Sequence, residues 1–243
     1  MRSLGKRVRE KSLQEFESLT LRNMKDKAKA VIFDMDGVIT DTQDLIAAAE
    51  SALLAEYGIM VTPEEITARY AGTTSREMMP HVFASFNIEM PELPVLIQQR
   101  KERIDAVVTG NVRAIPGTVE FIRELHERGV PIAVGSGSRT PFIRSALSEL
   151  GIFELFQNTT GSDEVANGKP APDTFLLAAE RLGIAPEYCL VIEDGKHGMV
   201  AAQQAGMRCI GLIRSGEYSR ETHPADAFVK NLSEVRIEDW LHV

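Results

Sequence analysis

An apolar run that ends in two aspartates constrains this chain more than any other feature of its sequence. Residues 31–42 read Val-Ile-Phe-Asp-Met-Asp-Gly-Val-Ile-Thr-Asp-Thr. The first three are β-branched or aromatic, which predicts a buried strand. Asp34 and Asp36 follow at a spacing of two, so we expect both carboxylates on one side of the strand end. Gly37 then allows the chain to turn sharply.

Two neighbouring carboxylates repel each other and lose hydration, a cost that proteins tolerate mainly where a cation or a proton is shared. The pair therefore indicates phosphotransfer chemistry with a divalent metal. A polar turn after a strand and a surface calcium loop are the plainer readings. An EF-hand loop begins after a helix and carries Glu at its twelfth position. Here a strand precedes the loop, and Leu45 stands twelfth when Asp34 is counted as the first.

The composition is that of a globular enzyme. A chain of 243 residues suffices for one large domain, or for a core with an inserted lobe. The net charge of −8 argues against an extended nucleic-acid-binding surface, and no stretch approaches the length of a membrane span. Cys189 and Cys209 lie in apolar runs, which indicates core thiols in a reducing compartment and a cytoplasmic protein. The sequence does not determine an oligomeric state and is compatible with a monomer.

The first 29 residues differ from the rest of the chain in charge. They contain nine Lys and Arg against four Asp and Glu, which leaves this segment at +5 and the remainder at −13. The segment lacks the apolar stretch of a signal peptide. We expect residues 1–29 to form a poorly ordered extension, and we assign it no function.

Helical periodicity dominates residues 43–110, where no convincing strand is found. Thr62 and Pro63 are typical of a helix start, as N-cap and first-turn residue. Gly58 just before them is a typical helix stop. Apolar spacing predicts helices that begin near residues 45, 62, 75 and 93. We therefore predict an all-helical insertion directly after the first strand.

Strands and helices alternate over residues 111–243. Apolar runs predict strands over residues 131–136, 156–159, 188–192, 208–213 and 227–229. Helical patterns of 10–15 residues separate most of them, which predicts βαβ units with right-handed crossovers. The expected fold class is therefore α/β, with a parallel sheet flanked by helices.

A small-residue loop follows the strand predicted over residues 131–136. It reads Gly-Ser-Gly-Ser-Arg and contains Ser136, Gly137 and Ser138. Backbone amides at a helix N-terminus, together with a serine hydroxyl, favour an anion. Because Gly/Ser turns after strands are common, this loop alone is weak evidence for a phosphate site.

Two further strand ends carry charged groups. Lys169 lies among glycine and prolines in residues 167–173, which suits contact with a phosphate or an acidic nucleophile, although a lone lysine is usually a solvated surface charge. Glu193 and Asp194 end another strand, and this second acidic pair can complete a site for a hard metal ion. Functional groups of parallel sheets gather beyond the carboxyl ends of the strands, so we expect these residues to converge.

Together these motifs resemble the haloacid dehalogenase superfamily, and the resemblance covers nearly everything after residue 29. The order and spacing of its four motifs match the Asp-x-Asp-Gly run, Ser136, the Lys169-Pro170 pair and the acidic pair. Residues 36–42 and 169–173 are especially similar to the β-phosphoglucomutase-like subfamily. The resemblance implies a Rossmann-like catalytic core, formed by residues 30–42 and 111–243, with a helical cap domain inserted at residues 43–110.

The resemblance also implies a role for each acidic residue. Asp34 would be the nucleophile that becomes an aspartyl phosphate. Asp36 would protonate the leaving oxygen and then activate water or a second hydroxyl. Asp34, the backbone carbonyl of Asp36 and Asp194 would hold Mg²⁺, and Glu193 would orient that ligand shell or join it.

The remaining implied roles concern the substrate. Ser136 and the amide of Gly137 would contact the phosphoryl oxygens, with Ser138 in the same loop, and Lys169 would balance the charge around the nucleophile. The cap segment that faces the site is expected at residues 71–76. From it we predict Thr73 and Arg76 as substrate contacts.

The subfamily contains both phosphatases and mutases. A mutase must hold a sugar bisphosphate while it reorients, which requires a cationic group in the cap. The sugar-phosphate mutases carry a lysine and a histidine where this chain has Ala71 and Ile46. We therefore predict a Mg²⁺-dependent phosphatase of a small phosphorylated metabolite, a sugar or polyol phosphate. A β-phosphoglucomutase-type mutase is the alternative. A non-catalytic binding protein is disfavoured because Asp34 and Asp36 are both present.

Overall fold

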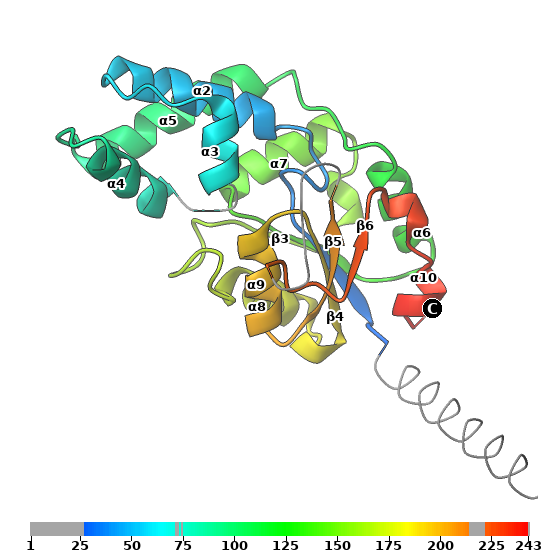
Figure 1. The fold of residues 1–243 in the computed structure, drawn as a ribbon. Coiled ribbons are helices and arrows are strands. Elements are labelled where there is room, and N and C mark those ends of the chain that lie inside the picture. The colour runs from blue at the N-terminus through cyan, green and yellow to red at the C-terminus, as the bar shows by residue number, and fades with distance from the viewer. Residues whose placement is uncertain (1–26, 71–72, 74, 214–221, 243) are drawn as a thin grey trace, which may run out of the picture.

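A computed structural model describes residues 27–70, 73, 75–213 and 222–242 (Figure 1). A central sheet has helices on both faces, and a separate group of helices, α2 to α5, lies beyond one end of it. Within the described ranges, no helix has the length and apolar character that crossing a membrane requires.

In the part of the chain that the structure describes, the sheet contains six strands in the order β3-β2-β1-β4-β5-β6, and every neighbouring pair is parallel. The predicted α/β class is therefore confirmed. The first strand of the chain lies in the middle of the sheet, between β2 and β4. The strands are β1 (Ala30–Phe33), β2 (Ile132–Gly135), β3 (Asn158–Thr160), β4 (Cys189–Glu193), β5 (Arg208–Leu212) and β6 (Ala227–Val229).

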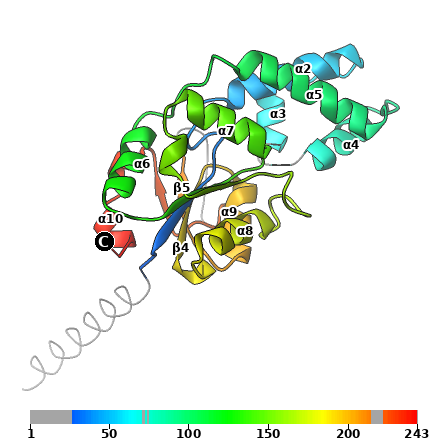
Figure 2. The same ribbon diagram turned by 180° about the vertical axis from the view of Figure 1, so that it is seen from behind.

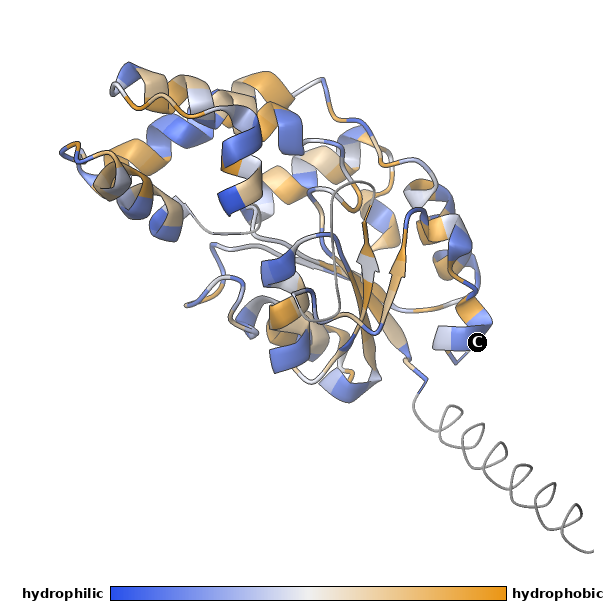
Figure 3. Cartoon of the chain, in the orientation of Figure 1, coloured by the Kyte–Doolittle hydropathy of each residue, from blue (hydrophilic) through white to orange (hydrophobic). Residues whose placement is uncertain are grey.

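Helices cover both faces of the sheet, as the view from behind also shows (Figure 2). Val31 and Phe33 of β1 pack on the face covered by α6 (Thr118–Glu127), α7 (Thr140–Glu149) and α10 (Ile237–Trp240). Ala30 and Ile32 point to the opposite face, covered by α8 (Asp173–Leu182) and α9 (Lys196–Gln204). A strand buried on both faces has to be apolar throughout, which explains the continuous run before the first aspartate. Its ribbon and those of its neighbours are mostly apolar in Figure 3, whereas the helices carry both colours.

Four helices lie between β1 and α6 in the described sequence: α2 (Gln43–Glu56), α3 (Pro63–Tyr70), α4 (Ser75–Ser85) and α5 (Leu93–Val108). They have an apolar core of their own, which includes Leu53, Phe83 and Leu96. Thr62 caps α3 as predicted. Its hydroxyl accepts the amide proton of Glu65 (3.3 Å), and the Glu65 carboxylate accepts that of Thr62 (3.0 Å).

The two linkers between this helical insertion and the sheet run side by side. Thr40 forms a bridge with Ala114, and the amide of Asp41 donates to the carbonyl of Arg113 (2.7 Å). The carboxylate of Glu149, at the end of α7, accepts the amide protons of residues 110 and 112 at 3.1 and 3.0 Å. These contacts fix the two linkers to each other and to the end of α7.

Some boundaries differ from those predicted. The described residues include three short 3₁₀ turns, η1 (Phe153–Leu155), η2 (Pro186–Tyr188) and η3 (Leu232–Glu234). The first delays the start of β3 to Asn158, and the second ends at Tyr188, so β4 begins one residue later than expected. Ala28, inside the expected extension, is buried and bridges Leu241, whereas residues 1–26 lie outside the described part of the chain.

Candidate active site at the strand ends

Three predicted site residues stand at the carboxyl ends of adjacent strands. Asp34 follows β1 directly, and its amide donates to the carbonyl of Ile192 (2.9 Å). Ser136 follows β2, and its amide donates to Thr160 (3.0 Å). Glu193 is the last residue of β4. Because β1 lies between β2 and β4, these residues share one edge of the sheet.

Lys169 joins two of these strand ends. Its ammonium nitrogen lies 2.7 Å from Oδ1 of Asp34 and 2.9 Å from Oε1 of Glu193. The lysine is only 1% exposed. Burial alone would lower the pKa of Lys169, but the two carboxylates more than offset this and raise it. Lys169 therefore stays protonated. It lies at the sheet edge that carries Asp34 and Glu193, here called the acidic edge.

An aromatic ring supports this buried ammonium group. The nitrogen of Lys169 lies 4.5 Å from the centre of the Phe175 ring, on α8. Phe175 packs closely over β2, because a Cβ on Gly135 would lie 3.0 Å from its ring. The glycine at the end of β2 therefore lets α8 approach the sheet and place the ring beneath the lysine.

Asp36 lies in a tight turn rather than in a continuation of β1. Its two carboxylate oxygens accept different hydroxyl groups, Oδ1 that of Thr42 at 2.5 Å and Oδ2 that of Ser138 at 2.7 Å. Burial raises the pKa of Asp36, and repulsion from Asp34 raises it further, whereas these hydroxyl groups act in the opposite direction. A carboxyl group with a raised pKa is suited to hold and release a proton.

Gly37 forms the bend of this turn with φ of +90°, a conformation that favours glycine. A Cβ at this position would lie 2.0 Å from Oδ2 of Asp194, which explains why the turn carries no side chain. The same oxygen of Asp194 accepts a hydrogen bond from Nε2 of Gln43 (2.8 Å). The turn thus brings Asp194 against the backbone that follows the nucleophile candidate.

Asp34, Glu193 and Asp194 fit a hard divalent cation. Each offers a carboxylate oxygen, and these oxygens all lie within 4.8 Å of one another. Among the described residues at this edge, these three carboxylates and that of Asp36 are accompanied by one ammonium group, that of Lys169. The formal charges of these five groups sum to −3 if all are ionised. Burial, followed by repulsion from Glu193 and Asp34, raises the pKa of Asp194 well above its ordinary value. These carboxylates therefore carry excess negative charge, which a bound metal ion would neutralise.

The loop after β2 has the features of an anion site. The hydroxyl oxygen of Ser136 accepts the amide proton of Ser138 (3.0 Å), which leaves the Ser136 hydroxyl proton to donate. Ser136 is only 1% exposed, whereas Gly137 and Ser138 are half-buried. Ser138, predicted as a substrate contact, donates its hydroxyl to Asp36 in this structure.

The predicted cap contacts are not brought to the strand ends by any hydrogen bond or ion pair among the described residues. Thr73 folds back on α3, where its amide and hydroxyl both donate to the carbonyl of Tyr70, at 3.0 and 2.7 Å. Arg76 is exposed in the first turn of α4. The other residues of the expected segment, 71, 72 and 74, lie outside the described residues.

Sequence reasoning missed three residues that shape the site. Thr42 and Gln43 bind the acidic residues from the start of α2, and only a turn that reverses the chain brings them there. Gly198 in α9 packs against Glu193, since a Cβ there would lie 1.8 Å from its Oε1. A glycine inside a helix was the available signal, because that position is otherwise unfavourable.

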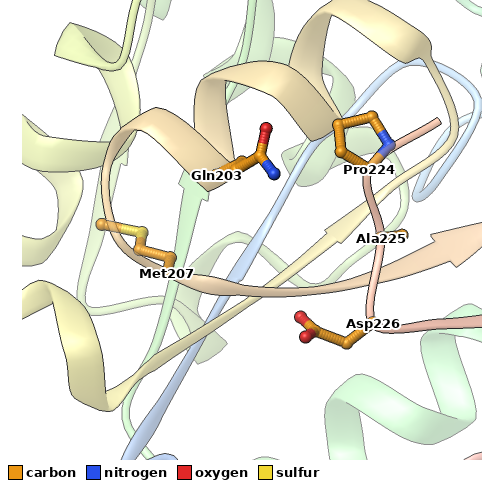
Figure 4. Close-up of a pocket in the computed structure, with 5 residues that line it drawn as sticks. All are labelled: Gln203, Met207, Pro224, Ala225 and Asp226. Carbon is orange, nitrogen blue, oxygen red and sulfur yellow. The ribbon is translucent and has the colours of Figure 1, made fainter. Parts of the chain in front are cut away.

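A hollow of about 310 Å³ lies elsewhere on the molecule (Figure 4). Gln203, Met207, Pro224, Ala225 and Asp226 line it. Met207 and Asp226 directly precede β5 and β6, so the hollow lies at the amino ends of these strands, opposite the acidic edge. It is therefore separate from the candidate active site.

Comparison with known proteins agrees with the fold. Residues 31–212 match the model of the haloacid dehalogenase-like hydrolases. The chain is 32% identical to the fructose-1-phosphate phosphatase YqaB of Escherichia coli, over 78% of this chain and 98% of that protein. It is 30% identical to the phosphorylated carbohydrates phosphatase of Thermotoga maritima, over 77% of this chain and 86% of the relative. The crystal structure of β-phosphoglucomutase from Clostridium difficile superimposes with a TM-score of 0.74 at 24% identity, over 87% and 94% of the two chains, which indicates a shared fold.

Proposed function

The chain belongs to the haloacid dehalogenase-like hydrolases, and we propose that it is a Mg²⁺-dependent phosphatase acting through an aspartyl phosphate on Asp34. Its substrate is a small phosphorylated metabolite, a sugar or polyol phosphate. The relatives named for fructose 1-phosphate and for phosphorylated carbohydrates support this substrate class. One observation carries the proposal: Lys169 holds Asp34 at the centre of an edge where Asp36 and Asp194 also meet.

The first half of the reaction transfers the phosphoryl group to the protein. A carboxylate oxygen of Asp34 attacks phosphorus, the new O–P bond forms, and the bond to the ester oxygen breaks. Asp36 in its protonated form gives its proton to the departing oxygen, so the product leaves as an alcohol. For this step Asp36 exchanges one of its hydroxyl partners, Thr42 or Ser138, for the ester oxygen.

The second half regenerates the enzyme. Asp36, now a carboxylate, takes a proton from water, and the resulting oxygen attacks phosphorus. The O–P bond to Asp34 breaks and inorganic phosphate is released. A covalent intermediate divides a very slow hydrolysis into two faster steps. Lys169 stays protonated throughout and stabilises the carboxylate of Asp34 as leaving group.

Binding of the phosphoryl oxygens falls to the loop after β2. The hydroxyl of Ser136 and the amide of Gly137 donate hydrogen bonds to them, with Ser138 beside them. Asp34, the carbonyl of Asp36 and Asp194 would hold Mg²⁺, with Glu193 beside them. The ion supplies positive charge that reduces repulsion between the nucleophile and the phosphate.

We propose that the helical insertion, residues 43–110, is a cap over this site, and that residues 30–42 and 111–243 form the catalytic core. The paired linkers at Thr40 and Ala114 support a hinge there. Thr73, between α3 and α4, and Arg76, in the first turn of α4, would then contact the substrate when the cap closes. The buried free thiols of Cys189 and Cys209 support a reducing compartment, and we place the enzyme in the cytoplasm.

Phosphate release tests the proposal. Purified full-length protein should release inorganic phosphate from sugar or polyol phosphates with Mg²⁺, and none after removal of the metal with EDTA. Absence of phosphate release from a broad panel of phosphate esters would overturn it. A mutase would instead convert β-glucose 1-phosphate to glucose 6-phosphate, primed by a bisphosphate, with little free phosphate.

A further inference from the structure

Gln43 touches two oxygens of the proposed magnesium site. Its side-chain nitrogen Nε2 donates to Oδ2 of Asp194 (2.8 Å) and lies 3.3 Å from the backbone carbonyl oxygen of Asp36. Gln43 is the first residue of α2, and 151 positions separate it from Asp194. Through this neutral side chain, the helical insertion reaches the acidic edge.

The turn at Gly37 is shaped around this contact. A Cβ at Gly37 would lie 2.0 Å from Oδ2 of Asp194 and 2.7 Å from Nε2 of Gln43. The side chains of Asp194 and Gln43 therefore both pack against the backbone of Gly37, which has no side chain. The space left by the glycine is filled by the hydrogen-bonded pair, so that the Asp194 carboxylate cannot rotate freely.

The chemistry of the amide suits a position beside a metal ligand. An amide N–H fixes one oxygen of a carboxylate and adds no charge, so it leaves attraction for a cation intact. A lysine here would repel the cation, and a glutamate would repel Asp194 and compete as a ligand. Partners of this kind commonly change metal affinity by 10- to 100-fold when they are removed.

We infer that Gln43 is a positioning residue for Mg²⁺, holding Asp194 by Oδ2 so that Oδ1 stays available as a ligand. The inference rests on the proposed function, because it uses that metal site. It adds that the insertion contributes to the affinity of the core for its metal.

Binding of Mg²⁺ alone tests this inference without reference to turnover. Calorimetric titration of the full chain with Mg²⁺ should show 10- to 100-fold weaker binding for Gln43→Met, which keeps the volume of the side chain and removes the donor. Gln43→Ala should weaken binding to a similar extent. Gln98→Met is the matched control, since Gln98 is exposed on α5 and bonds only Glu102 among described residues.

Kinetics provide the second readout. The Mg²⁺ concentration for half-maximal activity should rise by the same factor in Gln43→Met, while kcat at saturating Mg²⁺ stays within about threefold of wild type. If both Gln43 variants fold and bind Mg²⁺ within twofold of wild type, the inference is wrong although wild-type phosphate release would still support the proposed function. Wild-type protein that releases no phosphate would instead count against the function itself.

Discussion

The ammonium nitrogen of Lys169 lies 2.7 Å from Oδ1 of Asp34, across 135 positions of sequence. The same nitrogen lies 2.9 Å from Oε1 of Glu193. All three side chains are buried, so the lysine neutralises charge that water cannot reach. This ion pair connects the loop before α8 to the ends of β1 and β4, and it links the stability of the core to its chemistry.

Replacement of Lys169 by methionine should destabilise the metal-free protein by about 3–5 kcal/mol at neutral pH, because it leaves Asp34 and Glu193 buried without a partner. Urea unfolding in EDTA measures this. Burial raises the pKa of Glu193 and Lys169 lowers it, so removal of the lysine raises this pKa further. A raised folded pKa costs the protein stability as the pH rises, so the deficit of the variant relative to wild type should shrink toward acid. Lys196→Met, at an exposed lysine, should change stability little.

Asp36→Asn should lower kcat by about 10²–10⁴-fold, because an amide cannot transfer the proton. The fold should persist, since the amide oxygen still accepts the hydroxyl proton of Thr42. Steady-state phosphate release and thermal unfolding measure the two effects. Asp44→Asn, at an exposed carboxylate in the first turn of α2, is the control and should leave kcat unchanged. A kcat of Asp36→Asn within twofold of wild type would contradict the role of Asp36 as acid and base.

Gly37→Ala should destabilise the protein and weaken activity, because the added methyl group meets Asp194 at 2.0 Å on a backbone with φ of +90°. Gly129 distinguishes backbone strain from the steric clash with Asp194. Its φ is +71°, but a Cβ there would meet nothing within 4 Å. Gly129→Ala should therefore show backbone strain alone, about 1–2 kcal/mol, and Gly37→Ala clearly more. Equal losses in urea unfolding would show that Asp194 does not occupy this space.

Glu164 stabilises the loop after β3. Its carboxylate accepts hydrogen bonds from Arg181 (2.6 Å) and from the hydroxyl of Thr140 (2.6 Å). The hydrogen bond from Arg181 is the main cause that lowers the pKa of Glu164 to about 2. A depressed pKa gives stability that is present above the unfolded value of 4.5 and lost as pH falls toward 2.

Glu164→Gln should therefore lower the free energy of unfolding by about 1 kcal/mol at pH 7. This value is small because solvent screens the charges at this surface site. The difference from wild type should shrink as the pH falls below 4.5. Urea unfolding at several pH values measures this, and Glu89→Gln, at an exposed glutamate, serves as control. A difference that stays constant from pH 7 to the acid limit of folding would show that the carboxylate charge is unimportant.

The sequence predicts much of the core because strand periodicity and strand ends are local properties. The run before Asp34 is apolar throughout, so its burial on both faces could be expected. Once the sheet is parallel, the ends of β1, β2 and β4 must share an edge. That topology therefore predicts that Asp34, Ser136 and Glu193 lie close to one another.

The contacts between these residues depend on turns, which the sequence pattern does not determine. Gln43 reaches Asp194 only because the turn at Gly37 reverses the chain. The hydroxyl of Ser138, a predicted substrate contact, donates to Asp36, because the two loops meet across the sheet edge. Element boundaries shifted where 3₁₀ turns such as η2 satisfy backbone groups over three residues.

Phosphate release by Asp34→Asn tests the central claim most directly. The variant lacks the attacking carboxylate, and its amide oxygen can still accept the hydrogen bond of Lys169, so it should fold. With Mg²⁺ and the best substrate of wild type, phosphate release should fall by at least about 10³-fold, and no phosphorylated protein should form. Undiminished phosphate release by a folded Asp34→Asn variant would contradict every covalent role assigned to this residue.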